Sequence, residues 1–318
     1  MKHVVSVSLG SSKRDKKSCV EIMGESFEIS RIGTDGDMQK FASLMKELDG
    51  KVDAIGLGGI DRYLWAESKR YTIKDADKLA KIATTTPVVD GSGVKNTLER
   101  MTIQYLQKEG IYRFDDKKAL VVCAFDRFGM AQEIGKLAKE VIFGDFMFIL
   151  GINLPMRSYK TVKLVGNIAL PTFSKLPFKW LYPTGEKQNQ RKPSHHKYYN
   201  WADCIAGDYL LINKTLPEVE KGLLKGKTII SNTITEEDSE ELKNQGLHML
   251  VTSSPCYDGR HYATNVYEGV LISLLGKKPE DITLQDYEEL LKKIGWKPTI
   301  TLLNPQNNIN INHKIESV

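Results

Sequence analysis

Apolar runs alternate with amphipathic stretches along most of the chain. Residues 3–10 and 52–60 are apolar runs that end in glycines, which predicts two buried strands. Between them, residues 37–48 place apolar side chains at helical spacing, behind the capping sequence T-D-G-D and before Gly50, where a helix is expected to stop. Such alternation of strands and helices favours a parallel or mixed sheet.

The rest of the first half continues this alternation. The further elements expected there are a hairpin at 18–31, a helix at 73–83, a strand at 87–91 and a helix at 93–109.

The second half opens with a strand, a tight turn, a helix and a second strand within residues 119–150. VKLVGNIALP follows, and then a polar connector at about 171–200. The elements expected after it are strands at 205–212, 227–233 and 247–255, helices at 216–224, 235–245, 262–275 and 283–294, and a polar surface tail from 304.

These elements predict an α/β fold of two α/β domains, the C-terminal one Rossmann-like, with a cleft between them. We expect an N-terminal substrate-side domain at 1–115, a dinucleotide-binding domain at 116–275, and a C-terminal helix and tail at 276–318.

Composition narrows the class of protein. The 318 residues are 41% hydrophobic and 27% charged, which is ordinary for a globular protein, and no apolar run is long enough to span a membrane. The N-terminus has no apolar signal-peptide region. The four cysteines are far apart, without metal-ligand spacing, so we expect reduced thiols and a cytoplasmic location.

The turn at 124–129 stands where a dinucleotide fold carries its glycine fingerprint, but the three fingerprint positions are Ala124, Asp126 and Gly129. An acid at the second position repels a pyrophosphate, although Arg127 is placed to offset it. Asp145 follows at the spacing expected for a ribose acceptor, which favours NAD over NADP. The alternative is a Rossmann-like domain without a dinucleotide. The cofactor residues predicted from this turn and the later strand ends are Ala124, Asp126, Arg127, Gly129, Met130, Asp145, Ser231, Asn232, Thr233 and Thr252.

The loop DGSGVKNTLER at 90–100 is the candidate substrate site. The expected strand ends at Asp90, and Gly91 and Gly93 then bend the chain into the start of a helix. The free N–H groups at the start of a helix can bind a carboxylate or a phosphate. Asp90 and Lys95 are predicted to be catalytic, with Lys95 transferring a proton. The predicted substrate contacts here are Ser92, Gly93 and Asn96. The alternative is that Asp90 and Ser92 only cap a helix and Lys95 is solvated.

A third candidate is SSPCYDGRHYATNVYEG at 253–269, which leaves a strand, turns and starts a helix. We expect Arg260 and Asn265 to bind substrate and His261 to transfer a proton, unless Arg260 and His261 are surface turn residues. Glu268 adds a polar group to the same helix. Arg62 and Tyr63, after the glycines of GLGGIDRY, are further candidates.

The net charge of +5 is mild, and one stretch, KQNQRKPSHHK at 187–197, is basic without any acid. It is either a solvated loop or a site for nucleic acid or another anion. The charge is modest and few aromatic residues are interleaved with the basic ones, although Tyr198, Tyr199 and Trp201 follow, so nucleic acid is not the expected partner. The pair His195 and His196 lacks a third ligand nearby, so no metal is predicted. We expect a small-molecule substrate and no membrane partner. Whether the chain forms a homo-oligomer stays open.

Seven motifs together resemble a bacterial family labelled quinate/shikimate 5-dehydrogenase-like, over most of residues 3–275. They are VSVSLGSSKRD, RIGTDGD, VDAIGLGGIDRY, TPVVDGSGVKNTLER, FDRFGMA, CIAGDYLLI and GRHYATNVYEG. The resemblance implies Lys95 as the counterpart of the family's catalytic lysine and Asp90 as its acid. The chain departs from shikimate dehydrogenases in lacking the G-A-G-G-A turn, and Asp90 precedes the lysine instead of following it.

The sequence therefore predicts an NAD(P)-dependent oxidoreductase that acts on a small polar hydroxy or keto acid. The alternative is a non-catalytic regulatory protein that binds a nucleotide or anion on the same fold.

Overall fold

The computed structural model describes residues 1–66, 69–175, 191–217, 222–232, 234–257 and 260–305. The chain forms two compact units, each with its own sheet. Unit 1 comprises Met1–Thr97, Asn167–Gln188 and Pro255–Trp296, and unit 2 comprises Leu98–Gly166, Asn189–Ser254 and Lys297–Val318. The predicted α/β class with two sheet-bearing regions is confirmed. The units are less continuous in sequence than the expected domains, because the helical segment after Pro255 returns to unit 1.

The sheet of unit 1 has five strands in the order β2-β3-β1-β4-β7. Their bounds are β1 Lys2–Ser8, β2 Lys16–Ile22, β3 Glu25–Gly33, β4 Ala54–Gly58 and β7 Val88–Val89. The central strand β1 runs parallel to β3 and β4, and the predicted hairpin puts β2 antiparallel to β3. The carboxyl ends of β4 and β7 therefore meet at one edge of the sheet, since β7 is parallel to β4.

Helices cover both faces of this sheet. On one face, α1 (Met38–Leu48) and α2 (Lys74–Ala80) bury apolar side chains such as Phe41 and Met45 against alternate strand residues such as Val5 and Val7. On the other face lies α11 (Thr264–Leu275), close enough that a Cβ on Gly269 would lie 2.7 Å from a methyl carbon of Val4. Glycine at this position thus brings the polar residues of α11 against the sheet.

The remaining elements of unit 1 are short or peripheral. They are β5 Tyr63–Ala66 and β6 Lys69–Thr72, which form a hairpin, the 3-10 helices Ser12–Arg14 and Pro279–Asp281, the ribbon β13 Cys256–Tyr257 with β14 Arg260–His261, and α12 Leu284–Ile294. Thr283 and Asp286 form a capping box that fixes the start of α12.

The sheet of unit 2 has six strands in the order β15-β12-β11-β10-β8-β9. The strands are β8 Lys118–Val121, β9 Glu140–Phe143, β10 Cys204–Ala206, β11 Thr228–Ser231, β12 Met249–Thr252 and β15 Thr299–Leu302. All are parallel except β15, which pairs antiparallel with β12 at the edge. Numbered along the chain, the order is 2-1-3-4-5 plus an edge strand. That is the flavodoxin-like doubly wound order and differs from the order of dinucleotide-binding Rossmann domains.

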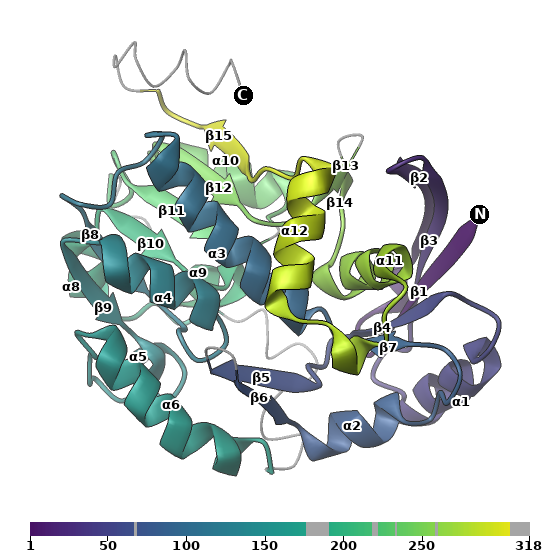
Figure 1. Ribbon diagram of the computed structural model, residues 1–318. Helices are drawn as coiled ribbons and strands as arrows, with labels where there is room; N and C mark the ends of the chain where they lie inside the picture. The colour runs from purple at the N-terminus through teal and green to yellow at the C-terminus, as the bar shows by residue number, and fades with distance from the viewer. Residues whose placement is uncertain (67–68, 176–190, 218–221, 233, 258–259, 306–318) are drawn as a thin grey trace. The chain divides into compact units, whose positions relative to one another are not determined.

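Unit 2 packs its helices around this sheet, with α3 and α4 in front of it in Figure 1. Their bounds are α4 Phe128–Leu137, α5 Asp145–Phe148, α8 His196–Trp201, α9 Tyr209–Thr215 and α10 Glu236–Asn244, while α3 Ser92–Lys108 and α6 Tyr159–Phe173 each run from one unit into the other. A core cluster joins Leu120, Ile205 and Ile229 of the strands to Tyr199 of α8 and Leu242 of α10.

Several described elements differ from the sequence prediction, which also did not include the β5–β6 hairpin, α5 or α8. The strand expected at 205–212 is only β10, because Gly207 breaks it and the Asp208 side chain caps α9. The helix expected at 216–224 is wrong for its described residues, because α9 has already ended at Thr215. VKLVGNIALP lies within α6, and the edge strand β15 was not predicted. Short apolar segments of this kind fit either a strand or a helix until packing decides.

No helix in the described residues is long and apolar enough to cross a membrane. Cys19, Cys123 and Cys204 are free thiols, and burial raises the pKa of Cys123 and Cys204.

Candidate functional site

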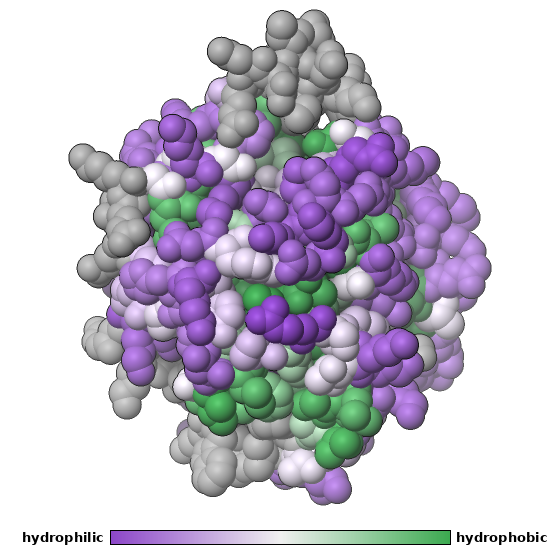
Figure 2. Space-filling model, turned by 90° about the vertical axis from the view of Figure 1, so that its left-hand side faces the viewer, coloured by the Kyte–Doolittle hydropathy of each residue, from purple (hydrophilic) through white to green (hydrophobic). Residues whose placement is uncertain are grey.

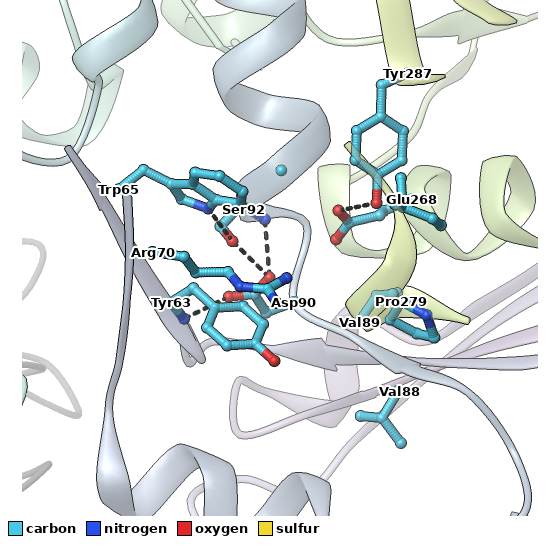
Figure 3. Close-up of a pocket in the computed structure, with 12 residues that line it drawn as sticks. Tyr63, Trp65, Arg70, Val88, Val89, Asp90, Ser92, Glu268, Pro279 and Tyr287 are labelled. Atoms are coloured by element: carbon cyan, nitrogen blue, oxygen red, sulfur yellow. Dashed lines mark hydrogen bonds between the residues drawn. The ribbon is translucent and has the colours of Figure 1, made fainter. Parts of the chain in front are cut away.

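A pocket in unit 1 lies where β7 leads into α3, and twelve residues of that unit line it (Figure 3). The pocket is open to solvent. The lining residues are Tyr63, Trp65, Arg70, Val88, Val89, Asp90, Ser92, Gly93, Glu268, Pro279, Ile282 and Tyr287. The pocket thus combines aromatic rings, two carboxyl groups and one guanidinium, which is a composition typical of small-molecule sites.

Asp90 is the residue on which the pocket wall is built. Its Oδ2 accepts hydrogen bonds from the backbone N–H groups of Arg62 (2.7 Å) and Tyr63 (2.9 Å). Its Oδ1 accepts from the backbone N–H (3.0 Å) and the hydroxyl (2.7 Å) of Ser92. Four donors match the number of hydrogen bonds that a carboxylate can accept, so the Asp90 side chain is held in one position as an acceptor. Asp90 was predicted as a catalytic acid; the structure places it in the pocket as the group that joins β5 to the start of α3.

The aromatic wall is fixed through the same residue. The indole N–H of Trp65 donates to the Ser92 hydroxyl at 2.9 Å, and Ser92 in turn donates to Asp90. The guanidinium of Arg70 stacks over the ring of Tyr63 at 4.4 Å and lies 5.9 Å from the Trp65 ring. Arg62 lies over the Tyr63 ring at 5.0 Å and forms an ion pair with Asp77 at 2.7 Å. Stacking leaves the N–H groups of Arg70 in the plane of its guanidinium, where they can bind a ligand.

Glu268 supplies the second carboxyl group from α11 and is buried. Its Oε1 accepts from the Tyr287 hydroxyl and its Oε2 from the backbone N–H of Gly91, both at 2.6 Å. Burial raises the pKa of Glu268 to about 7, and the nearby charge of Asp90 acts in the same direction. A carboxyl group of this kind exchanges its proton near neutral pH and can either donate a hydrogen bond or accept one.

Two glycines make room for this arrangement. Gly91 has φ +87°, and a Cβ there would lie 2.4 Å from the backbone nitrogen of Asn265. A Cβ on Gly93 would lie 2.7 Å from Oε1 of Glu268 and 2.9 Å from the ring of Tyr287. The D-G-S-G motif is therefore required because α11 and α12 pack directly against this turn.

The other residues predicted for this site have different surroundings. Lys95 is half-buried on α3 and Asn96 is buried there, and neither lines the pocket. Asn265 donates from Nδ2 to the Ser6 hydroxyl at 2.8 Å, so it joins α11 to β1. Arg260 and His261 lie on β14, and their side chains fall outside the described part of the chain. Sequence reasoning noted Glu268 and Tyr63 but missed Trp65, Arg70 and Tyr287, because no motif marks the hairpin or α12.

The predicted cofactor residues lie in unit 2 at the carboxyl ends of β8, β9, β11 and β12, but several of them are bound to other groups of the protein. Arg127 is buried and forms ion pairs with Glu99 and, at 2.7 Å, with Asp208. Burial opposes its charge, but the Glu99 and Asp208 carboxylates hold the pKa of Arg127 well above its usual value. The guanidinium also forms a longer ion pair with Asp126, at 3.8 Å, so protein carboxylates engage it on every side that these contacts describe.

Asp145 also has a structural partner where a ribose was expected. It is buried and accepts a hydrogen bond from the backbone N–H of Phe125 at 2.8 Å, which fixes the turn after β8. Burial raises the pKa of Asp145 to about 7.

The predicted cofactor residues at the later strand ends of unit 2 also form hydrogen bonds within the protein. Asn232 donates to Asp208 at 3.2 Å and Ser231 donates to the Gly207 carbonyl at 2.6 Å. Ala124, Gly129, Met130 and Thr252 are buried, and Thr233 lies outside the described residues. In the described part of the chain, no three or more His, Cys, Asp and Glu side chains are grouped to hold a metal ion.

Comparison with known proteins places the chain in a family. A family model described as a domain of unknown function (DUF8754) matches residues 93–303, which is more than half of the chain, so the protein belongs to this family. A second model, a domain of unknown function (DUF8753), matches residues 3–90. No curated protein matches the chain.

Solved structures similar to the chain include sugar-binding proteins and a putative malic enzyme. A galactofuranose binding protein is 11% identical, with 100% of this chain and 98% of that chain covered and a TM-score of 0.37. An ABC transporter solute binding protein from Agrobacterium vitis, bound with alpha-D-tagatopyranose, is 11% identical, with 99% of each chain covered and a TM-score of 0.41. A putative malic enzyme (malate oxidoreductase) is 12% identical, with 99% of this chain and 83% of that chain covered and a TM-score of 0.37.

The predicted NAD(P)-dependent oxidoreductase is wrong. The strand order of unit 2 and the engaged guanidinium of Arg127 supply the physical reason, because the turn after β8 lacks the glycines and the available cation that a pyrophosphate needs. NAD or NADP as a cofactor stays a prediction, and so does the likeness to quinate/shikimate 5-dehydrogenases.

Replacing Arg127 by Met is expected to lower the free energy of unfolding by about 3–5 kcal/mol, because it leaves the buried Glu99 carboxylate without its cation. Urea unfolding followed by circular dichroism measures this loss. Arg113→Met is the matched control, because the exposed pair of Arg113 with Asp115 is worth at most about 1 kcal/mol. Adding Glu99→Gln to Arg127→Met should recover part of the loss. Equal effects of the two arginine variants would contradict this account.

Replacing Glu268 by Gln is expected to change how stability depends on pH. The pKa of Glu268 has its ordinary value of 4.5 in the unfolded chain and is about 7 in the folded protein. As pH rises, Glu268 therefore loses its proton in the unfolded state first. Wild-type stability therefore has its full Glu268 contribution below pH 4.5 and loses it progressively up to pH 7. The substituted glutamine stays neutral at every pH. As pH rises from about 5 to about 8, the free energy of unfolding of the variant should therefore increase relative to that of the wild type, by on the order of 2–3 kcal/mol.

Thermal unfolding at both pH values tests this expectation, with the α12 surface variant Glu288→Gln as the control. A difference between the Glu268 variant and wild type that stays constant with pH would show that this carboxyl group does not titrate as described.

Proposed function

We propose that the protein binds a small, neutral, hydroxyl-bearing molecule in the pocket of unit 1. The observation that supports this most directly is the placement of Arg70 and Glu268 on the lining of one aromatic-walled pocket. A hydroxyl group both donates and accepts hydrogen bonds, so it matches a guanidinium that only donates and a carboxyl group that accepts when ionised.

The balance of charge supports a neutral ligand. Asp90 and Glu268 disfavour an anion, and Arg70 disfavours a cation, so neither kind of charge is complementary to the pocket as a whole. The rings of Tyr63, Trp65 and Tyr287 present apolar surface against which the carbon skeleton of a polyol or monosaccharide can pack.

The second part of the proposal concerns the role of Asp90. Because its four hydrogen bonds are made within the protein, Asp90 positions Trp65 and the hairpin and leaves ligand contact to Arg70 and Glu268. A cytoplasmic location and a homo-oligomeric state remain predictions from the sequence.

Binding is expected to raise the midpoint of thermal unfolding and to change tryptophan fluorescence, because Trp65 lines the pocket. Both signals are measured with a panel of neutral monosaccharides and polyols. Sugar acids and amino sugars are included as charged ligands, so that the panel tests the preference for neutral ones. Isothermal titration of the best ligand should show binding about ten- to a hundredfold weaker for Arg70→Ala, which loses charged hydrogen bonds.

Arg113→Ala, an exposed arginine of unit 2, is the matched control and should bind like the wild type. Trp65→Phe should remove the fluorescence change while a ligand still binds. Preference for charged ligands, or equal binding by Arg70→Ala and wild type, would overturn the proposal.

A further inference from the structure

Unit 2 exposes a group of large aliphatic side chains where α5 leads into α6. Ile149, Leu150, Ile152, Leu154 and Leu164 are each between 50% and 62% exposed, whereas most large aliphatic residues in the described part of the chain are not exposed. The face of the molecule that carries α5 and α6 shows hydrophobic residues gathered in its lower part (Figure 2). An exposed aliphatic group of this size is typical of an interaction surface.

The same segment lacks acidic residues. Residues 146–175 contain no Asp or Glu, in a chain with 40 acidic residues among 318. Arg157, Lys160 and Lys163 are exposed between the aliphatic residues of the loop and Leu164. The segment therefore presents apolar and positive groups together.

A second acid-free stretch packs against the first. Residues 191–202 contain no acid, and residues 191–197 among them, with Arg191, Lys192 and Lys197, belong to the basic stretch at 187–197. The Tyr198 hydroxyl donates to Asn153 at 3.0 Å, and the His195 ring lies 4.9 Å from the Phe148 ring. These contacts place the two stretches side by side. We name residues 149–164 with 191–197 the aliphatic–basic face.

The charge of this face indicates its partner. A second copy of the chain in a symmetric dimer would bring positive charge against positive charge, which disfavours self-association. Protein interfaces concentrate aromatic and Arg anchors and are depleted of Lys, whereas the apolar groups exposed here are Ile and Leu and the cations include Lys160, Lys163, Lys192 and Lys197. Aliphatic residues flanked by Lys and Arg are what binds at the interface of an anionic bilayer.

We propose that the aliphatic–basic face docks unit 2 reversibly on the surface of an anionic lipid bilayer. Ile149, Leu150, Ile152, Leu154 and Leu164 enter the boundary between head groups and acyl chains, and the surrounding Lys and Arg side chains bind lipid phosphates. The sequence prediction of no membrane partner rested on the absence of a span, which this mode of binding does not need. It is also independent of the pocket in unit 1.

Vesicle flotation with the full chain tests the proposal. Binding is expected to vesicles of phosphatidylcholine with about a quarter phosphatidylglycerol and not to pure phosphatidylcholine, and it should weaken as salt is raised. Leu164→Glu should lower binding at least tenfold, while Leu210→Glu, at an equally exposed leucine on α9, should not change it. Lys160→Gln should lower binding about fivefold, and Lys51→Gln in unit 1 should leave it unchanged.

Absence of binding to the anionic vesicles, or equal binding to both compositions, would overturn the proposal. Sedimentation velocity distinguishes the competing occupant: a wild-type dimer that Leu164→Glu converts to a monomer, without vesicle binding, would assign the face to self-association instead. Circular dichroism of each variant checks that its fold is intact, which the exposure of the substituted residues leads us to expect.

Discussion

Four hydrogen bonds converge on the carboxylate of Asp90, and the pocket of unit 1 depends on them. They tie the start of the β5–β6 hairpin to the N-terminus of α3, and through Ser92 they also orient the indole of Trp65. A buried carboxylate is stable only when its lone pairs are satisfied, so the surrounding backbone has little freedom to move. The aromatic wall and the stacked Arg70 are therefore held in position before any ligand arrives, which lowers the entropic cost of binding.

A neighbouring acid makes this arrangement sensitive to pH. Glu268 lies close enough to Asp90 for their charges to interact, and it is buried, so its own ionisation is disfavoured near neutral pH. The Tyr287 hydroxyl and the Gly91 N–H satisfy its two oxygens in part. The two carboxyl groups of the pocket thus have different roles. Asp90 holds the backbone around the pocket in position, and Glu268 is the group that can gain or lose a proton when a ligand binds.

In unit 2, the turn that the sequence predicted to bind a cofactor is part of the protein core. The residues that resemble a dinucleotide fingerprint surround a buried ion pair of Arg127 with Glu99, and Asp145 fixes the turn by a backbone hydrogen bond. These interactions use the polar groups that a phosphate or ribose would need. Elsewhere in the same unit, aliphatic side chains lie outside the core. The aliphatic and basic groups exposed between residues 149 and 164 face solvent.

The sequence by itself determined the α/β class, the hairpin of β2 with β3, most helix starts and the importance of D-G-S-G, because periodicity, caps and glycines act over a few residues. It also placed Asp90, Ser92 and Gly93 at one site. Only the tertiary structure decided that Trp65, Arg70, Glu268 and Tyr287 join them, because the hairpin, α11 and α12 are distant in sequence and meet through packing. It likewise decided that Arg127 binds Glu99 rather than a phosphate, since no local pattern records which buried acid faces an arginine.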